Sequence, residues 1–334
     1  MEATSRKFAS LMKNGKLTAA VKLLTNTMEG GVLPLSEETM TLLRAKHPAP
    51  GELEEEAIVQ IDPLPSHPVI FDEINGDSVK AAALKTHGGA GPSGLDADGW
   101  RHILASRSFG QASEDFRNEF ACAIRKLCTE FVAVTEDIYG CATSDIEAFL
   151  ACRLIPLDKN PGLRPIGVGE VLRRIAGKVF MAVVKGDVQE SVGSLQVCAG
   201  QAGGCEAAIH AMRSIYESDD SDCVLLIDAA NAFNSMNRSA MLKNIERICP
   251  AAYIYAYNCY AAHARLFVLG GKEIRSMEGT TQGDPPSMAF YAIGLLPLIW
   301  CLAEPAEPAE PSELAESAEP EDRSKQAAYA DDLT

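Results

Sequence analysis

The sequence predicts an α+β protein in which helices alternate with a few short strands. Short apolar segments bounded by turn residues have the length and composition of strands, and they cover residues 154–157, 165–168, 223–227, 265–269 and 272–277. Gly270 and Gly271 join the last two segments, and paired glycines suit the positive φ angles of a tight hairpin turn. Other segments are apolar at helical spacing, as at Cys205, Ile209, Met212 and Tyr216.

The helical segments and the proline positions suggest how the chain is organised. Helices are expected at about 170–185, 203–217, 239–249, 251–262 and 285–302, and over most of 114–152. Ser36 and either Asp96 or Asp98 are suitable N-caps for two further helices. Residues 47–68 are rich in proline and glutamate and are expected to form a linker. We therefore take residues 1–87 as an N-terminal helical region followed by a linker.

Length and charge exclude several classes of protein. The 334 residues leave room for two or three domains at about 100–200 residues each. A net charge of −16 excludes a uniformly basic nucleic-acid-binding protein. The charge is uneven, because residues 304–322 hold seven Glu and one Asp without Lys or Arg, whereas residues 153–185 hold seven basic and two acidic residues. The low-complexity acidic insert at 303–322 is expected to be disordered, and a polyanion is expected to meet the basic segment.

Cysteine usage and hydropathy point to an intracellular protein. The ten cysteines are scattered without a C-x-x-C pair, and the six histidines lack the spacing of a zinc site. The N-terminus has no apolar signal-peptide segment. The longest apolar run, 288–303, is too short for a membrane span and contains Gly294 and Pro297. We expect a location in the cytoplasm or nucleus, no secretion and no membrane partner.

Three polar segments could carry chemistry. Asp228 directly follows the apolar strand 223–227, where a carboxylate is held rigidly at the strand end; it could also simply cap the next turn. Asp331 and Asp332 are adjacent like charges, which are either solvated at the surface or neutralised by a cation. Gln282-Gly283 forms a polar turn before an apolar helix, and alone it could be no more than a helix start.

The order of these segments resembles the palm of a reverse transcriptase: a strand-end Asp, a Gln-Gly turn with a helix, then Tyr-Ala-Asp-Asp. The segment RLIPLDKNPGLRPIGVGEVLRRIAGK resembles the fingers of that family, and GPSGLDADGWR resembles a segment upstream of the fingers in non-LTR (LINE-like) retroelements. The resemblance covers about residues 88–334. It implies a right-hand polymerase fold, with fingers-like residues 88–221 and a palm at 222–334 whose antiparallel sheet is backed by helices.

The resemblance implies an RNA-directed DNA polymerase that acts on an RNA or DNA template with a primer and on dNTPs. Nucleotidyl transfer in that family is assisted by two Mg²⁺ ions, for which Mn²⁺ can substitute, and hard carboxylate oxygens suit such ions. The catalytic and metal-binding residues would be Asp228, Asp331 and Asp332. The dNTP-binding residues would be Lys159, Arg164, Phe233, Gln282 and Gly283, and Gln201 would lie near the template.

Several of these assignments have alternatives. Phe233 would exclude a ribonucleotide 2′-hydroxyl, or it is a core residue at a strand–helix corner; Lys159 and Arg164 could belong to a solvated basic loop. Asn231 and Asn234 depart from the commoner charged residues of the family. The family also continues beyond the Asp pair with a returning strand and a thumb, which are absent here, so we expect this chain to be weak or inactive by itself. A catalytically inactive retroelement remnant that at most binds nucleic acid is the main alternative, and a phosphohydrolase of unrelated fold is another.

Overall fold

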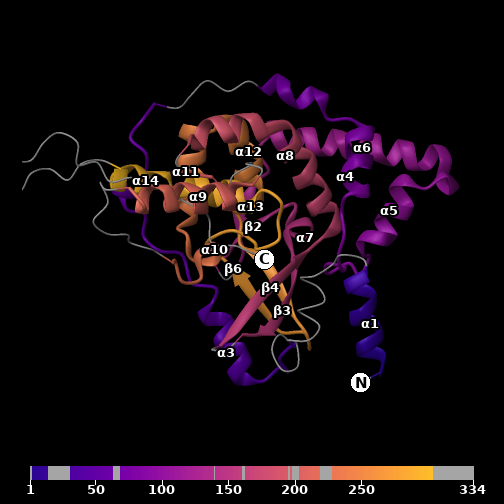
Figure 1. Ribbon diagram of the computed structural model, residues 1–334. Helices are drawn as coiled ribbons and strands as arrows, with labels where there is room; N and C mark the ends of the chain where they lie inside the picture. Colours follow the sequence, from indigo (N-terminus) through magenta and orange to yellow (C-terminus); the bar gives the residue numbers. More distant parts are fainter. Residues whose placement is uncertain are drawn as a thin grey trace, which may run out of the picture.

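A four-stranded sheet and a body of helices make up the mixed α+β fold (Figure 1). The computed structural model describes residues 2–13, 31–62, 68–138, 140–159, 162–194, 196–197, 203–218 and 228–303. The α+β class expected from the sequence is thus confirmed. The expected strand 223–227 and nearly all of the acidic insert lie outside the described residues.

Two hairpins build the sheet, and both were expected from the sequence. Its strands are β3 (Cys152–Asp158), β4 (Leu163–Gly169), β5 (Ala264–Val268) and β6 (Glu273–Ser276). Their order is β4-β3-β5-β6, with β3 and β5 parallel and the two hairpin pairs antiparallel. Gly270 and Gly271 have φ angles of 88° and 81°, as a tight turn between β5 and β6 requires.

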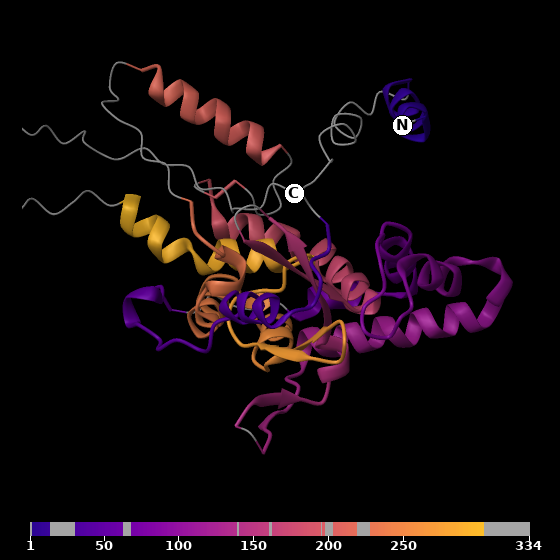
Figure 2. The same cartoon turned by 90° about the horizontal axis from the view of Figure 1, so that it is seen from below.

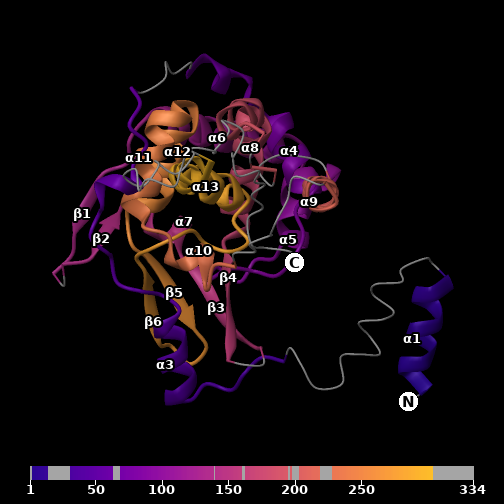
Figure 3. The same cartoon turned by 60° about the vertical axis from the view of Figure 1, so that its left-hand side comes forward.

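Helix α3 (Glu37–Ala45) covers one face of this sheet (Figure 3). Ser36 caps it, its hydroxyl accepting a 3.0 Å hydrogen bond from the Thr39 backbone N–H. Met40 and Leu43 are fully buried against apolar residues of the sheet, which include Cys152, Leu154, Leu163, Leu266, Val268 and Ile274. The chain just before α3 pairs with β3 through an isolated bridge between Val32 and Leu157.

The main core lies in the helical body. Its helices are α4 (Gly76–Leu84), α5 (Ala97–Ala105), α6 (Gly110–Thr129), α8 (Val171–Val192), α11 (Arg238–Ile248), α12 (Pro250–Tyr260) and α13 (Ser287–Gly294). The Phe180 and Tyr255 rings stack at its centre, with centroids 4.1 Å apart and planes 9° apart. Helices α4, α5 and α6 lie together to one side of the sheet (Figure 2). The other helices are α1 (Glu2–Lys13), α7 (Glu147–Leu150), α9 (Gly204–Tyr216), α10 (Ala232–Ser235) and α14 (Leu296–Ala303).

Two expectations from the sequence were wrong. The segment 114–152 is helical to Thr129 and again in α7. Between these helices it forms a two-stranded ribbon of β1 (Val134–Glu136) and β2 (Ala142–Ser144), because β-branched residues there pair across a turn at Gly140. The described part of the 47–68 segment is not a free linker. Ile58 and Val59 are buried, and the Val59 N–H donates to the Asn244 side chain at 2.9 Å.

Two helices differ in extent from the prediction. Helix α8 continues seven residues past the expected end at 185, to Val192, and Gly193 follows it with a φ angle of 63°. The helix expected at 285–302 is two helices, α13 and α14, that meet at Leu295. Across the described ranges, no helix is both long and apolar enough to cross a membrane.

Candidate functional site

The turn after Asp228 is held by its asparagines. Asn231 has a φ of 57° and is the one non-glycine residue with positive φ in the described parts of the chain. Asparagine tolerates this conformation better than most residues. Its side-chain N–H groups donate to the Ser235 hydroxyl at 2.8 Å and to the Lys46 carbonyl at 3.0 Å. These hydrogen bonds therefore fix the start of the short helix α10, a few residues after the exposed Asp228.

The Gln-Gly turn packs directly on the turn after Asp228. The Thr280 N–H donates to the Phe233 carbonyl at 2.6 Å, and the Gly279 N–H donates to the Met236 carbonyl at 2.8 Å. Gly279 has a φ of 63°, and a Cβ there would overlap the Phe233 carbonyl oxygen and lie 2.6 Å from the Asn234 carbonyl carbon. Only glycine fits this approach, so the two turns are fixed relative to each other.

Gly279→Ala should therefore lower the free energy of unfolding by at least about 2 kcal/mol, because it combines a positive φ with a backbone overlap. Chemical denaturation measures the change. Gly271→Ala is the matched control, since Gly271 also has a positive φ, of 81°, but its Cβ would meet nothing within 4 Å. Equal losses of stability in the two variants would contradict a close approach of the Phe233 and Asn234 backbone to Gly279.

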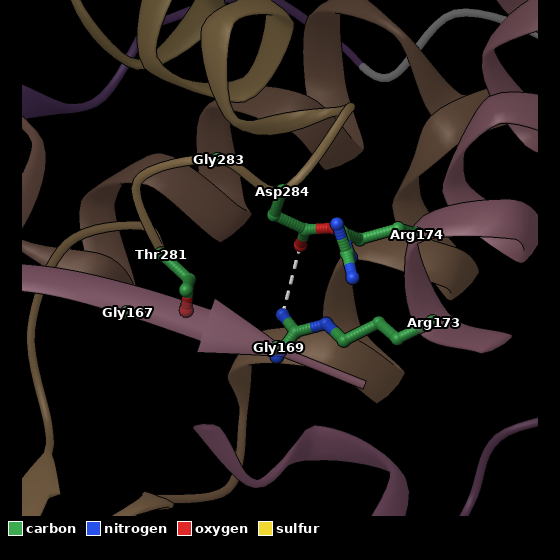
Figure 4. Close-up of a pocket in the computed structure, with 7 residues that line it drawn as sticks. All are labelled: Gly167, Gly169, Arg173, Arg174, Thr281, Gly283 and Asp284. Atoms are coloured by element: carbon green, nitrogen blue, oxygen red, sulfur yellow. Dashed lines mark hydrogen bonds and ion pairs between the residues drawn. The ribbon is translucent and has the colours of Figure 1, made fainter. Parts of the chain in front are cut away.

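A buried ion pair fixes the far end of the Gln-Gly turn to helix α8 (Figure 4). An Arg173 terminal N–H lies 2.8 Å from an Asp284 carboxylate oxygen, and both side chains are nearly fully buried. The Tyr260 hydroxyl donates to the same oxygen at 2.6 Å, and Arg173 also donates to the Leu150 carbonyl at 2.9 Å. Burial alone would lower the pKa of Arg173, but the Asp284 charge holds it well above its usual range.

A second buried arginine supports the chain just before the turn. Arg238 donates to the carbonyls of Ala262, Ser276, Glu278 and Gly279 at 2.9–3.3 Å. Burial lowers its pKa to about 10, with the charge of Glu278 acting the other way. The Glu278 carboxylate accepts the backbone N–H groups of Arg238 and Gly51. These contacts were not predictable from the sequence, because the partners are distant along the chain.

The Gln-Gly turn also contacts strand β4. A Cβ on Gly167 would lie 3.3 Å from the Thr281 methyl group, so the turn and the strand are close here. A small pocket of about 10 Å³, enough for about one water molecule, lies at this meeting point. The residues that line it are His47, Leu154, Pro165, Gly167, Asn234, Leu266, Ser276, Thr281 and Gln282. We refer to it as the β4 pocket.

The β4 pocket brings together three of the segments singled out in the sequence. Pro165 and Gly167 come from β4, Asn234 comes from the turn after Asp228, and Gln282 comes from the Gln-Gly turn. The exposed Gly283, with a φ of 90°, follows directly. Segments more than one hundred residues apart in sequence thus form one site.

The two basic residues expected to bind dNTPs lie at the tip of the β3–β4 hairpin. Lys159 is exposed, and its backbone N–H donates to the Gly162 carbonyl at 3.2 Å. Arg164 is half-buried on β4 between Leu163 and Pro165. Side chains alternate along a strand, so Arg164 belongs to the face opposite the one that Pro165 presents to the pocket. Their role with dNTPs stays a prediction.

Part of the basic segment 153–185 is used inside the protein. Arg173 is buried against Asp284 as described, Arg174 donates to the carbonyls of His87 and Gly89 at 2.8 and 2.5 Å, and Lys178 donates to the Lys85 carbonyl at 2.7 Å. Arg174 and Lys178 thus donate to carbonyls at and after the C-terminal end of α4, where the helix dipole favours positive charge. Arg153, Lys159 and Lys185 remain exposed.

Phe233 is 8% exposed, and its ring packs on Tyr291 with centroids 4.8 Å apart. Ala232 is buried in the same cluster, and Met236, Met288 and Leu295 pack around it. The position agrees with the core alternative for this residue. Its effect on the choice of sugar stays a prediction.

The expected metal ligands are described only in part. Asp228 is exposed, and carboxylate oxygens suit a hard cation such as Mg²⁺. Asp331 and Asp332 lie outside the described residues, as does Gln201. Within the described ranges there is no group of three His, Cys, Asp or Glu side chains that could hold a metal ion. Models of known protein families do not match the chain, and a search of curated proteins found no significant match.

Proposed function

We propose that this chain is an RNA-directed DNA polymerase, which extends a primer 3′-hydroxyl with dNTPs on an RNA or DNA template. In this proposal residues 88–221 form the fingers-like region and residues 222–334 form the palm. The observation that carries it is the β4 pocket, where the β4 strand, the turn after Asp228 and the Gln-Gly turn meet. An unrelated phosphohydrolase would give neither the β3–β4 hairpin nor the Gln-Gly turn a role.

The proposal assigns a role to each of these residues. Asp228 would hold Mg²⁺ together with Asp331 and Asp332, and bound Mg²⁺ would supply charge neutralisation at the reacting phosphate. Lys159, exposed at the hairpin tip, would attract the triphosphate of the incoming nucleotide. Gln282 would contact that nucleotide from the Gln-Gly turn, and the adjacent Gly283 would allow close backbone approach.

The direct test is single-nucleotide incorporation on a primed RNA template with Mg²⁺ and excess protein over primer. Addition of the templated dNTP, and no addition of the three others, would support the proposal. Salt-dependent binding to the primer–template without any incorporation would instead indicate an inactive remnant that binds nucleic acid. The assay should be repeated on a DNA template, which measures the template preference.

Phe233→Ala should relax the preference for deoxyribonucleotides over ribonucleotides by about tenfold, if the ring limits the space for a 2′-hydroxyl, a difference of about 1.4 kcal/mol. The measurement is the ratio of incorporation efficiencies for each dNTP and its ribonucleotide. Tyr291→Leu is the control, because it loosens the same cluster and leaves the Phe233 ring in place. Equal relaxation in both variants would assign the effect to packing and not to the ring.

A further inference from the structure

The Tyr260 hydroxyl bridges the two ends of the Gln-Gly turn. Tyr260 is the last residue of α12 and is 1% exposed. Its hydroxyl donates to the Asp284 carboxylate at 2.6 Å and accepts a longer hydrogen bond, of 3.4 Å, from the Thr281 backbone N–H. Gln282 and Gly283 lie between these two attachment points. One side chain of α12 therefore holds both flanks of the turn.

The backbone of the turn adds a hydrogen bond of its own. The Asp284 N–H donates to the Thr281 carbonyl at 3.0 Å, and Gly283 has a φ of 90°, as the third residue of a type II turn requires. The Ser287 hydroxyl donates to the same Thr281 carbonyl at 2.5 Å. Gln282 is the second residue of this turn, so its place depends on how firmly the first and fourth residues are held.

Two buried guanidinium groups hold the Tyr260 ring. The Cζ atoms of Arg173 and Arg238 lie 5.4 and 5.5 Å from the ring centroid, within the range of a cation–π interaction. Arg173 also binds the Asp284 carboxylate, and Arg238 donates to the Gly279 carbonyl, so both arginines contact the ring and the chain around the turn. Burial and the Asp284 charge raise the pKa of Tyr260 well above its usual range. The hydroxyl therefore keeps the proton that it donates to Asp284.

We propose that Tyr260 is a positioning residue, which sets the place of Gln282 for the incoming nucleotide by holding Thr281 and Asp284. This inference rests on the proposed polymerase function, in which Gln282 contacts that nucleotide. Removal of the hydroxyl would take the acceptor from the Thr281 N–H and one donor from Asp284. The turn would then occupy its binding position for a smaller fraction of the time, and a nucleotide would bind correspondingly more weakly.

Tyr260→Phe removes the hydroxyl and keeps the ring beside the two arginines. We expect the KM for the templated dNTP to rise about five- to tenfold, the effect of one hydrogen bond, while kcat changes by less than about twofold. A double-mutant cycle with Gln282→Ala tests the route of the effect. If Tyr260 acts through Gln282, the double variant should have the KM of Gln282→Ala alone. A further rise in KM in the double variant would overturn the proposal.

Hydrogen exchange separates this inference from the proposed function, because it needs no catalysis. The Thr281 amide of Tyr260→Phe should exchange at least about tenfold faster than in the wild type. Tyr255→Phe is the matched control, since Tyr255 is a fully buried tyrosine of the same helix whose ring stacks on Phe180, and it should leave KM and this exchange rate unchanged. Unchanged exchange in Tyr260→Phe, or an equal change in Tyr255→Phe, would overturn the positioning role. Faster exchange in Tyr260→Phe without incorporation by the wild-type chain would overturn the polymerase proposal while supporting the hold of Tyr260 on the turn.

Discussion

Asp284→Ala should lower the free energy of unfolding by about 3–5 kcal/mol, because it leaves the buried Arg173 guanidinium without its counter-charge. Arg173 is 1% exposed, and water cannot replace the lost carboxylate. The Tyr260 hydroxyl would lose its acceptor as well. Chemical denaturation of the wild type and the variant, followed by far-UV circular dichroism, measures the difference.

The chain offers a matched control for this prediction. Arg213 and Glu217 on α9 form an ion pair with the same N–O distance of 2.8 Å, but their side chains are 72% and 60% exposed. Glu217→Ala should change the stability by less than about 1 kcal/mol, because solvent screens an exposed pair. Comparable losses in the free energy of unfolding of Asp284→Ala and Glu217→Ala would show that burial does not make the Arg173–Asp284 pair more important for stability than an exposed pair.

A double variant separates the ion pair from the packing around it. Arg173→Met with Asp284→Leu replaces both charges by apolar side chains of similar length, and such replacements of buried pairs are often close to neutral. We expect this variant to be more stable than Asp284→Ala alone, even though the Leu150 carbonyl and the Tyr260 hydroxyl each lose a partner. A double variant less stable than Asp284→Ala would mean that these hydrogen bonds, and not charge compensation, dominate at this site.

The sequence predicted the elements of the site better than the contacts between them. The β3–β4 and β5–β6 hairpins follow from short apolar runs separated by turn residues, which is local information. The Arg173–Asp284 pair joins residues 111 apart in sequence, and Arg173 was counted with a basic segment expected to face a polyanion. No local pattern distinguishes an arginine that will be buried by a later loop from its exposed neighbours.

The N-terminal segment shows the same limit. Proline and glutamate around residues 47–68 suggested a linker, yet the described part holds the pocket residue His47 and the buried residues Ile58 and Val59. The adjacent apolar pair Ile58-Val59 is the signal that could have indicated packing. Nothing in the sequence placed His47 beside Gln282, because that depends on how α3 crosses the sheet. The meeting of β4, the turn after Asp228 and the Gln-Gly turn was likewise not predicted by any local pattern.

Asp228→Asn should reduce single-nucleotide incorporation by about a thousandfold, equivalent to about 4 kcal/mol of transition-state stabilisation. An amide has nearly the shape of the carboxylate but lacks the negative charge that a divalent cation requires. The exposed position of Asp228 means that the change should hardly affect folding. Asp331→Asn should cause a loss of similar size, and Asp145→Asn, at an exposed aspartate near β2, should cause none.

Binding distinguishes a catalytic role of Asp228 from a role in holding nucleic acid. Removal of a negative charge near a phosphate backbone should leave the affinity for a primer–template unchanged or slightly higher, with the same salt dependence. A variant that binds the primer–template normally but does not extend it would place the defect in the chemical step. If Asp228→Asn or Asp331→Asn retains wild-type incorporation, the carboxylates do not hold the reacting cations, and the polymerase chemistry must be assigned to other residues or abandoned.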